Sequence, residues 1–501
     1  MAGTNRRRKV LMIGIDAGDI DFIRASLAGL PNLSRLLEEG AFFPLTSPAE
    51  HMPGSVWPTF YTGTPPGEHG ISQHIQWDPG AMRMRRLSAD WFQCEPFWYD
   101  LERRGLRVAA IDVPFAFPSR LKRGVEINNW GSHDLLGRFE VHPAELGREI
   151  RRRFGKHPMG YEIPVDKTRR QLEAMRQELL TGVRIKAELS RWLLDSGEWD
   201  FFLTVFGETH RGGHILWRDP DDHRSVIPEG AFLDVYRAVD AGVGHILEGL
   251  DLKTTTLIVF SLHGMGSNPS QGHFMRRVME RINGCYQAGN EWAEASVAGE
   301  AAGSPGVIRR LRESMPPGLQ HAAARMVPVE VRDWIVGREV TGGLDWPHTP
   351  GFAVRSDLNG FVRLNLRGRE RDGMLEPGTD ACHRYRDWVA ECLLSLELAG
   401  TGDRVVRDLL SAQEVLPGAR SDLLPDLVVR WADQPPADRL FSDRLGEITT
   451  PLGSGRGGEH RPNGFALMLG DKPDGGLLSR LGHTADFAGF VRGLFDLAMP
   501  G

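Results

Sequence analysis

The chain lacks the sequence features of a secreted, membrane-spanning or disulfide-stabilised protein. Its 501 residues contain only four cysteines, in neither a paired framework nor a CxxC motif, so we expect reduced structural thiols. No apolar run is long enough to cross a membrane, and the first run, residues 10–15, is too short for a signal-peptide core. We therefore expect a cytoplasmic protein with no membrane partner.

The chain also lacks a strong excess of charge of either sign. Its formal net charge is -6, and its one basic cluster, residues 6–9, is typical of a solvated N-terminal tail. We predict no nucleic-acid partner. Neither an internal repeat nor a low-complexity segment is visible, and oligomeric state has no sequence signature here. The length exceeds that of one compact domain, which predicts a large core with a substantial insertion.

Three continuous apolar runs of strand length are present at residues 10–15, 201–206 and 257–260. Such runs predict parallel strands that are buried on both faces. Helical patterns at residues 32–39, 167–194 and 231–250 alternate with these runs and with a further strand at residues 108–113. The sequence therefore predicts an α/β fold with a mostly parallel central sheet flanked by helices.

The alternation loosens after residue 263, where small residues and proline become frequent. We expect residues 1–270 to form the first part of the core, 271–440 an inserted α+β lobe or lid, and 441–501 the return to the core. The patterns that support this division are a helical piece at 307–313, strands at 361–366, 427–429 and 464–469, and helices at 385–398 and 484–497.

Residues that can bind metal follow each of the three apolar runs. Asp16, His210 and His263 come just after them. In an open α/β sheet, side chains beyond the carboxyl ends of the strands converge although they are far apart in sequence. His214 lies four residues after His210, on the same face if the segment is helical, and His460 comes late in the chain. Together these residues predict one metal site, although Asp16 alone could equally cap a turn.

An ordered set of motifs resembles the alkaline phosphatase superfamily, and within it the type I phosphodiesterase/nucleotide pyrophosphatase-like phosphohydrolases. The motifs are, in chain order, Ile13-Gly14-Ile15-Asp16, Leu30-Pro31-Asn32-Leu33, Trp57 with Thr62-Gly63, Pro66-Gly67-Glu68-His69-Gly70, Phe260-Ser261-Leu262-His263-Gly264-Met265, Asn365-Leu366-Arg367-Gly368-Arg369-Glu370, Pro425-Asp426-Leu427 and Glu459-His460-Arg461-Pro462. The resemblance extends over nearly the whole chain. It implies hydrolysis of phosphodiesters or nucleotide-like pyrophosphates, and a small anionic substrate.

The resemblance also implies two divalent ions that act with a serine or threonine nucleophile. Carried over by position, it places one ion on His210, His214 and His460 and the other on Asp16 and His263. We expect zinc, as one or two ions, with manganese and iron as alternatives.

The chain departs from the family pattern at three positions of this site. His210 stands where the family has an aspartate, and Leu262 stands where the second ion has a carboxylate ligand. The family's nucleophile position falls on Pro53, so that Ser55 is the nearest hydroxyl. Three imidazoles with an open position still form a recognised zinc arrangement. Glu208, two residues before His210, is a candidate fourth ligand or base.

Two chemistries stay open. In one, Ser55 attacks phosphorus and water later cleaves the phosphoseryl intermediate. Ser55 could equally be a helix N-cap, with Thr59 and His51 as fallback candidates for the nucleophile. In the other, a single metal activates water, with Asp16, Glu208 or His263 as acid or base. The second chemistry leaves room for a repurposed mononuclear metalloenzyme that acts on a non-phosphate group in specialised metabolism.

Overall fold

The central sheet of the protein has eight strands in the order β2-β19-β9-β1-β8-β5-β6-β7. The structure is a computed structural model that describes residues 8–92, 94–133, 136–160, 166–219, 225–287, 327–452, 456–471, 473 and 475–497. The strands of this sheet are β1 (Lys9–Ile15), β2 (Ala41–Leu45), β5 (Val108–Ile111), β6 (Val125–Asn128), β7 (Glu140–His142), β8 (Phe201–Phe206), β9 (Thr255–Ser261) and β19 (Gly464–Gly470).

The middle of the sheet is parallel, as the sequence predicts. Strand β1 pairs in parallel with β8 and β9, with Ile13 beside Thr204 and Val259. All residues of β8 and β9 are buried, which explains why these strands are continuously apolar. The returning strand β19 pairs antiparallel with β9, and the outer strands β2 and β7 are antiparallel to their neighbours.

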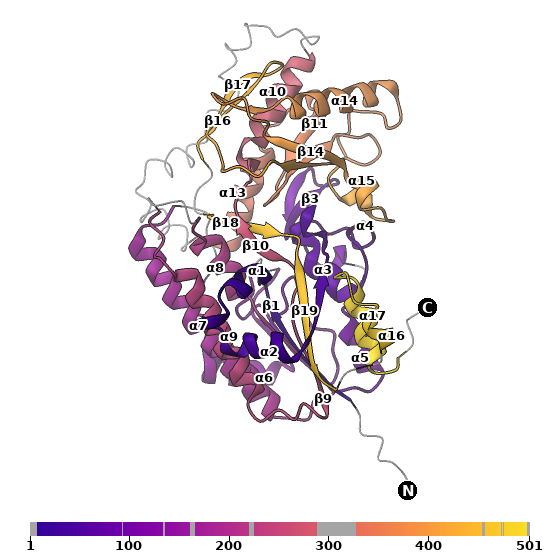
Figure 1. Cartoon of the computed structure of the whole chain (residues 1–501). Coiled ribbons are helices and arrows are strands. Elements are labelled where there is room, and N and C mark those ends of the chain that lie inside the picture. Colours follow the sequence, from indigo (N-terminus) through magenta and orange to yellow (C-terminus); the bar gives the residue numbers. More distant parts are fainter. Residues whose placement is uncertain are drawn as a thin grey trace.

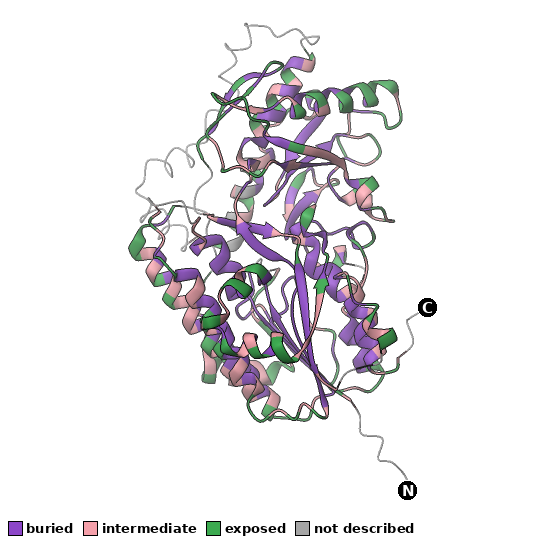
Figure 2. Cartoon of the chain, viewed as in Figure 1, coloured by how far each residue is buried: buried purple, intermediate pink, exposed green. Residues whose placement is uncertain are grey.

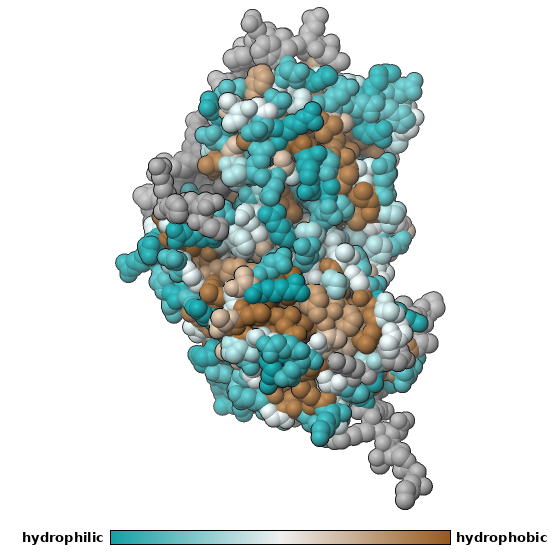
Figure 3. Space-filling view, viewed as in Figure 1, coloured by the Kyte–Doolittle hydropathy of each residue, from teal (hydrophilic) through white to brown (hydrophobic). Residues whose placement is uncertain are grey.

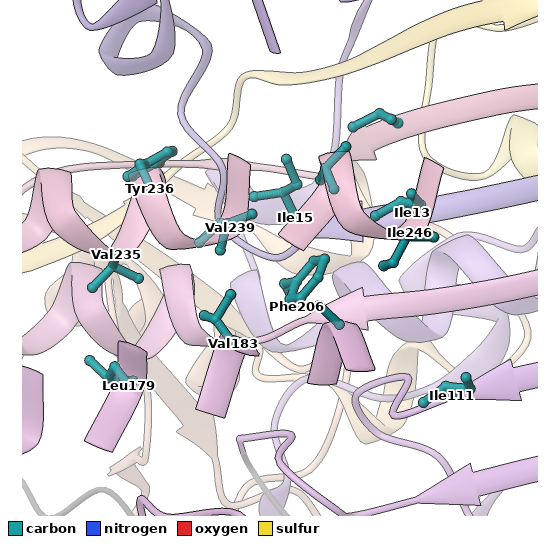
Figure 4. Packing of buried hydrophobic residues seen from close by; sticks show 14 of the residues in the cluster. Ile13, Ile15, Ile111, Leu179, Val183, Phe206, Val235, Tyr236, Val239 and Ile246 are labelled. Carbon is teal, nitrogen blue, oxygen red and sulfur yellow. The ribbon is translucent and has the colours of Figure 1, made fainter. Parts of the chain in front are cut away.

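Helices cover both faces of this sheet (Figure 1). One face carries α2 (Pro31–Glu39), α6 (Ala144–Phe154), α7 (Arg169–Asp195) and α9 (Ala231–Leu247), and the other carries α3 (Val56–Thr62), α5 (Phe97–Arg103) and α17 (Asp486–Leu494). In Figure 4, Leu179 and Val183 of α7 and Val235 and Val239 of α9 lie against the strands near Phe206. Full burial of each such side chain stabilises the fold by about 1.5–3 kcal/mol.

Helix α7 shows how local sequence sets an element's start. Thr168 accepts a hydrogen bond from the Gln171 backbone, and the Gln171 side chain accepts one from the Thr168 backbone, which forms a capping box. Figure 2 shows the resulting helix with one buried and one exposed side, while the central strands are buried throughout. The helix expected at 385–398 begins and ends earlier, because Thr379 caps α14 (Asp380–Leu394) and residues 397–398 form a strand.

A second group of strands lies above the carboxyl edge of the main sheet (Figure 1). Its four-stranded antiparallel sheet has the order β11-β12-β15-β14 and packs against α10 and α14. The elements are α10 (Met275–Gln287), α13 (Val329–Thr341), β3 (Ile75–Asp78), β4 (Arg83–Arg86), β11 (Gly351–Val354), β12 (Gly360–Leu364), β13 (Glu397–Leu398), β14 (Val406–Ser411), β15 (Leu427–Trp431), β16 (Arg439–Ser442) and β17 (Gly446–Thr449).

The remaining elements are α1 (Ile20–Ala25), α4 (Pro66–His69), α8 (Glu208–Leu216), α15 (Ala412–Val415), α16 (Gly475–Leu478), β10 (Gly264–Ser267) and β18 (Gly458–Arg461).

The helical piece expected at residues 307–313 lies outside the described residues, and the three-part division of the chain stays a prediction. Within the described part, no helix has both the length and the apolar character to cross a bilayer. Figure 3 shows polar residues over much of the upper part of one face and hydrophobic residues gathered in its lower half.

Candidate metal centre

The carboxyl edge of the central sheet collects the residues singled out from the sequence. Asp16 follows β1, His263 follows β9, and α8, which directly follows β8, carries His210 and His214. His460 arrives from the other direction on β18, because the antiparallel β19 begins at this same edge, with Phe465 beside Ser261. The structure thus brings five predicted site residues together, and each is at most 4 % exposed.

Two glycines allow α8 and β18 to lie in direct contact. A side chain at Gly458 would place its Cβ 2.4 Å from the Gly213 carbonyl oxygen, and one at Gly213 would lie 2.6 Å from Met265. Neither position accepts a larger residue without movement. The close approach lets the Nδ1 atom of His214 lie 2.8 Å from the Gly458 carbonyl oxygen.

Three imidazole rings turn the same nitrogen toward one point. The Nε2 atom of His210 lies 3.0 Å from Nε2 of His214 and 3.3 Å from Nε2 of His460. Two nitrogens bound to one tetrahedral zinc ion, each at 2.0–2.1 Å, lie about 3.3–3.4 Å apart. The spacing of the three rings therefore fits one tetrahedrally coordinated cation.

The groups around two of these rings favour a proton on Nδ1. A carbonyl oxygen only accepts, so the Nδ1 atom of His214 donates to Gly458. The Nδ1 atom of His210 lies 3.1 Å from a carboxylate oxygen of Asp16, which attracts the proton to that nitrogen. Both neutral rings are then left with lone pairs on Nε2, and these lone pairs face each other at 3.0 Å. Such lone pairs repel each other unless a cation lies between them.

The rings are neutral and ready to bind metal at neutral pH. Burial lowers the pKa of His210 to about 4 and holds the pKa values of His214 and His460 well below the usual value. Neutral imidazole is the form that coordinates metal. The donor set therefore fits the divalent ion that the family resemblance implies.

The Asp16 carboxylate makes a second set of contacts at this edge of the sheet. Its Oδ1 atom accepts a hydrogen bond from Trp57 Nε1 at 2.9 Å and lies 3.5 Å from Nε2 of His263. Its Oδ2 atom lies 3.1 Å from Nδ1 of His210 and 3.1 Å from Nδ1 of His133. Burial alone would raise the pKa of Asp16, but His210 and His133 outweigh it and hold this pKa well below its usual value.

His133 is a site residue that the sequence analysis missed. Its ring stacks on that of His210 with 3.5 Å between the centroids. The feature that could have identified His133 is its position five residues after β6, on the same carboxyl edge as Asp16. Strand β6 has only four residues and no conspicuous apolar run, so nothing in the sequence drew attention to the loop that follows it.

A buried ion pair supports the loop that carries His133. Both oxygens of Asp112 accept backbone hydrogen bonds, one from Trp130 and one from Gly131, each at 2.8 Å. Lys186 of α7 donates to the same carboxylate and to the Val205 carbonyl oxygen. Burial would raise the pKa of Asp112, but Lys186 outweighs it and lowers the pKa. The loop is therefore tied to β5, α7 and β8.

Glu208 is not directed at the three imidazoles but contacts His157. Its Oε1 atom lies 3.0 Å from Nε2 of His157, whose Nδ1 atom lies 3.0 Å from the Met159 carbonyl oxygen. Burial would raise the pKa of Glu208, but the charge of Lys186 and the hydrogen bond from His157 outweigh it and lower the pKa. Among the described residues that could hold a metal, Glu208 belongs to neither group of ligand atoms.

The candidate nucleophiles lie in α3 and on the chain that enters it. Ser55 is fully buried and donates its hydroxyl to the Met52 carbonyl oxygen at 2.6 Å, without capping the helix. The Thr59 hydroxyl lies 3.1 Å from Nε2 of His69, and Nδ1 of His69 accepts a hydrogen bond from the Ile71 backbone, so this histidine joins α3 to the loop that follows it. His51 is half-buried, and burial lowers its pKa. Helix α3 does reach the site, through Trp57.

The arginine-rich turn after β12 serves the second sheet. Arg369 forms two short hydrogen bonds with Asp426 and contacts Glu370, which also binds Arg363. The guanidinium group of Arg369 is therefore already paired with carboxylates. The turn is therefore part of a salt-bridged network that joins β12 to the chain before β15.

A basic cavity of about 270 Å³ adjoins the site behind His133. Ser132, which precedes His133, and Arg211, which follows His210, both line it, together with Arg151 and Lys156. The described residues of its wall include three basic side chains and no acidic one. Arg211 is 3 % exposed, and its Nε atom has no hydrogen-bond partner among the residues that the structure describes.

Comparisons with known proteins point to one family. A sequence model described as type I phosphodiesterase/nucleotide pyrophosphatase matches residues 10–309, more than half of the chain. Among solved structures, phosphonoacetate hydrolase from Sinorhizobium meliloti, in complex with phosphonoformate, is 15 % identical with a TM-score of 0.51. Murine ectonucleotide pyrophosphatase/phosphodiesterase 5, an inactive variant in complex with AMP, is 12 % identical with a TM-score of 0.49. Each comparison covers 98 % of this chain and 96 % of the other. A search of curated protein sequences finds no match.

Proposed function

The chain belongs to the type I phosphodiesterase/nucleotide pyrophosphatase family, and we propose that it is a phosphoester hydrolase that depends on a divalent metal ion held by His210, His214 and His460. Family membership makes the chain a hydrolytic enzyme that acts on phosphoesters or related phosphorus compounds. The metal, its ligands and the choice among substrates are the parts that we propose.

One observation carries the proposal for the metal. The Nε2 atoms of His210 and His214 face each other at 3.0 Å, while an oxygen lies beside Nδ1 of each ring, 2.8 Å from His214 and 3.1 Å from His210. Zinc is the ion that three imidazoles with an open position suit best. Bound there, such an ion supplies Lewis-acid chemistry and lowers the pKa of a bound water to about 7.

The residues around this centre have distinct tasks in the proposed enzyme. The Gly458 carbonyl oxygen orients His214, and Asp16 orients His210, so that both rings present Nε2. His263 lies on the Asp16 side of the site with Nδ1 3.2 Å from the Gly264 carbonyl oxygen, which leaves its Nε2 atom to accept or deliver a proton. Burial of all these side chains excludes bulk water and strengthens their electrostatic effects.

The basic cavity supports an anionic substrate. Three positive side chains without a described acidic neighbour favour a negative group, and the unpartnered Nε–H of the buried Arg211 can donate to one. Arg211 and His210 are adjacent on α8, so a phosphorus ester bound at the metal could place a second anionic group toward Arg211. This arrangement suits a nucleotide-like pyrophosphate, which carries an anionic phosphoryl group on each side of the bond that is cleaved.

Two routes for the attack are distinguished by the surroundings of Ser55. In the covalent route the Ser55 hydroxyl forms a bond to phosphorus, the leaving-group oxygen departs, and water later cleaves the phosphoseryl ester. The hydroxyl is buried and donates to Met52, so this route requires it to exchange that partner. We favour direct attack by water for this reason, with His263 as the acid or base.

A second candidate function has an observation of its own. Leu262 is 1 % exposed at the position where the family resemblance places a carboxylate ligand. A centre altered in this way could serve a mononuclear metalloenzyme that acts on a non-phosphate group. Bound zinc without any turnover of phosphorus esters would favour this alternative.

The proposal is tested by turnover of bis-p-nitrophenyl phosphate with zinc-loaded protein. His214→Ala should reduce turnover at least ~100-fold and chelation should abolish it, because the metal loses a ligand or is removed. His245→Ala is the matched control, since the His245 side chain is 41 % exposed. Unchanged turnover in His214→Ala would refute the proposed centre.

A further inference from the structure

We infer that this chain builds a centre for one metal ion, in which Asp16 holds the His210 ring from outside the coordination shell and binds no cation itself. The inference rests on the proposed function, because it concerns the same three imidazoles. It departs from the two-ion site that the family resemblance implies, in which the aspartate after the first strand and the histidine after β9 bind a second ion.

Three ring nitrogens already surround the Asp16 carboxylate. Trp57 donates to Oδ1 at 2.9 Å, and the Nδ1 atoms of His133 and His210 each lie 3.1 Å from Oδ2. Trp57 can only donate, and its ring is packed in the core at 3 % exposure. Oδ1 is thus engaged by an N–H group, and Oδ2 faces the Nδ1 atoms of two imidazole rings, on the sides where a second cation would have to bind.

The three imidazoles share one pattern. Each ring presents Nε2 to the common point and has an oxygen near Nδ1: Asp16 for His210, the Gly458 carbonyl for His214, and a Glu459 oxygen 3.5 Å from His460. Outer carboxylates and carbonyls that orient ligand histidines in this way are a general property of zinc centres. Asp16 fits the pattern as one of these outer oxygens.

Too few donors remain for a second ion. Leu262 is buried among hydrophobic residues where the carboxylate ligand is expected, and Pro53 replaces the hydroxyl ligand. His263 offers only Nε2, because its Nδ1 atom lies 3.2 Å from the Gly264 carbonyl oxygen. Asp16, His210 and His263 also lie close enough to share a cation, but His210 turns Nε2 to the first ion. The carboxylate and one nitrogen of His263 that remain fall short of the three protein ligands of a stable catalytic site.

Metal content measured by plasma mass spectrometry tests this inference. After dialysis against excess zinc and then buffer, the wild-type chain should retain one ion, and Asp16→Asn and His263→Ala should also retain one. Loss of the outer carboxylate should weaken zinc binding roughly 10–100-fold in Asp16→Asn, measured by competition with a chelator. His214→Ala should retain well below one ion, which calibrates the assay.

X-ray absorption at the zinc edge gives a readout that does not depend on activity. We expect three imidazoles per zinc in the wild type and the same three in Asp16→Asn, with the fourth position taken by a light atom from solvent. Two ions in the wild type with one in Asp16→Asn, or loss of an oxygen ligand from the spectrum of Asp16→Asn, would overturn the inference. Circular dichroism of each variant establishes that it is folded.

Failure of this inference is distinguishable from failure of the proposed function. Two bound ions together with turnover of bis-p-nitrophenyl phosphate would leave the proposed hydrolase intact and refute the single-ion centre. One bound ion without turnover would support the single-ion centre and count against the phosphoester reaction.

Discussion

Removal of either partner of the buried Lys186–Asp112 ion pair should strongly destabilise the protein. Both side chains are 0 % exposed, and Lys186 donates hydrogen bonds to Asp112 and to the Val205 carbonyl oxygen. Without Lys186, Asp112 would stay in the core with only the two backbone N–H groups of Trp130 and Gly131 to stabilise its charge. Breaking a buried pair in this way costs about 3–5 kcal/mol.

A double-mutant cycle isolates the pair from the effects of each side chain alone. Lys186→Met keeps the length of the side chain, and Asp112→Asn suits the left-handed backbone at this position, where φ is 57°. Each single variant should lower the free energy of unfolding by about 3–5 kcal/mol. The double variant should lose at least ~2 kcal/mol less than the sum, because it leaves no unpaired buried charge.

Urea unfolding followed by tryptophan fluorescence measures these differences, provided that the variants share one m-value. Lys253→Met is the control, since Lys253 is exposed and its loss should change stability by less than about 0.5 kcal/mol. The reasoning would be refuted if either single variant lost less than about 1 kcal/mol, or if the two losses were additive.

Three further predictions concern a buried carboxyl group, a glycine contact and the route of attack. Burial raises the pKa of Glu126 to about 7, so its stabilising contribution is complete below its unfolded pKa near 4.5 and is lost as pH rises through about 7. Relative to Glu126→Gln, the wild type should therefore lose about 3 kcal/mol between pH 4.5 and 8 in urea titrations, and a flat difference would contradict this. Gly213→Ala places a Cβ 2.6 Å from Met265, so the melting curve should show a loss of about 1–3 kcal/mol and a chelator competition should show weaker zinc binding. Ser55→Ala should keep most turnover of bis-p-nitrophenyl phosphate if water attacks directly, whereas a loss beyond ~1000-fold would favour the phosphoseryl route.

The sequence allowed the strands at the centre of the sheet to be predicted, because strands buried on both faces are continuously apolar. Asp16, His210 and His263 could be proposed as neighbours for the same reason, since each follows such a strand. The direction of β19 was not predictable from its composition. It brings His460 to the site only because it runs antiparallel to β9.

Contacts that depend on loops and short strands could not be predicted from patterns in the sequence. His133 follows a four-residue strand, and its position depends on Asp112 and Lys186, which are 74 residues apart in sequence. Glu208 looked like a ligand because it lies two residues from His210, but its side chain turns toward His157. Two residues that are close in sequence at the start of a helix can direct their side chains to different partners, as Glu208 and His210 do.

The most direct test of the account is a crystal structure of zinc-loaded protein with anomalous diffraction data collected at the zinc edge. The account predicts one anomalous peak within bonding distance of the Nε2 atoms of His210, His214 and His460, with Asp16 beside Nδ1 of His210. Rings that enclose no peak in fully loaded crystals, or a peak bound by Asp16 and His263 instead, would contradict it.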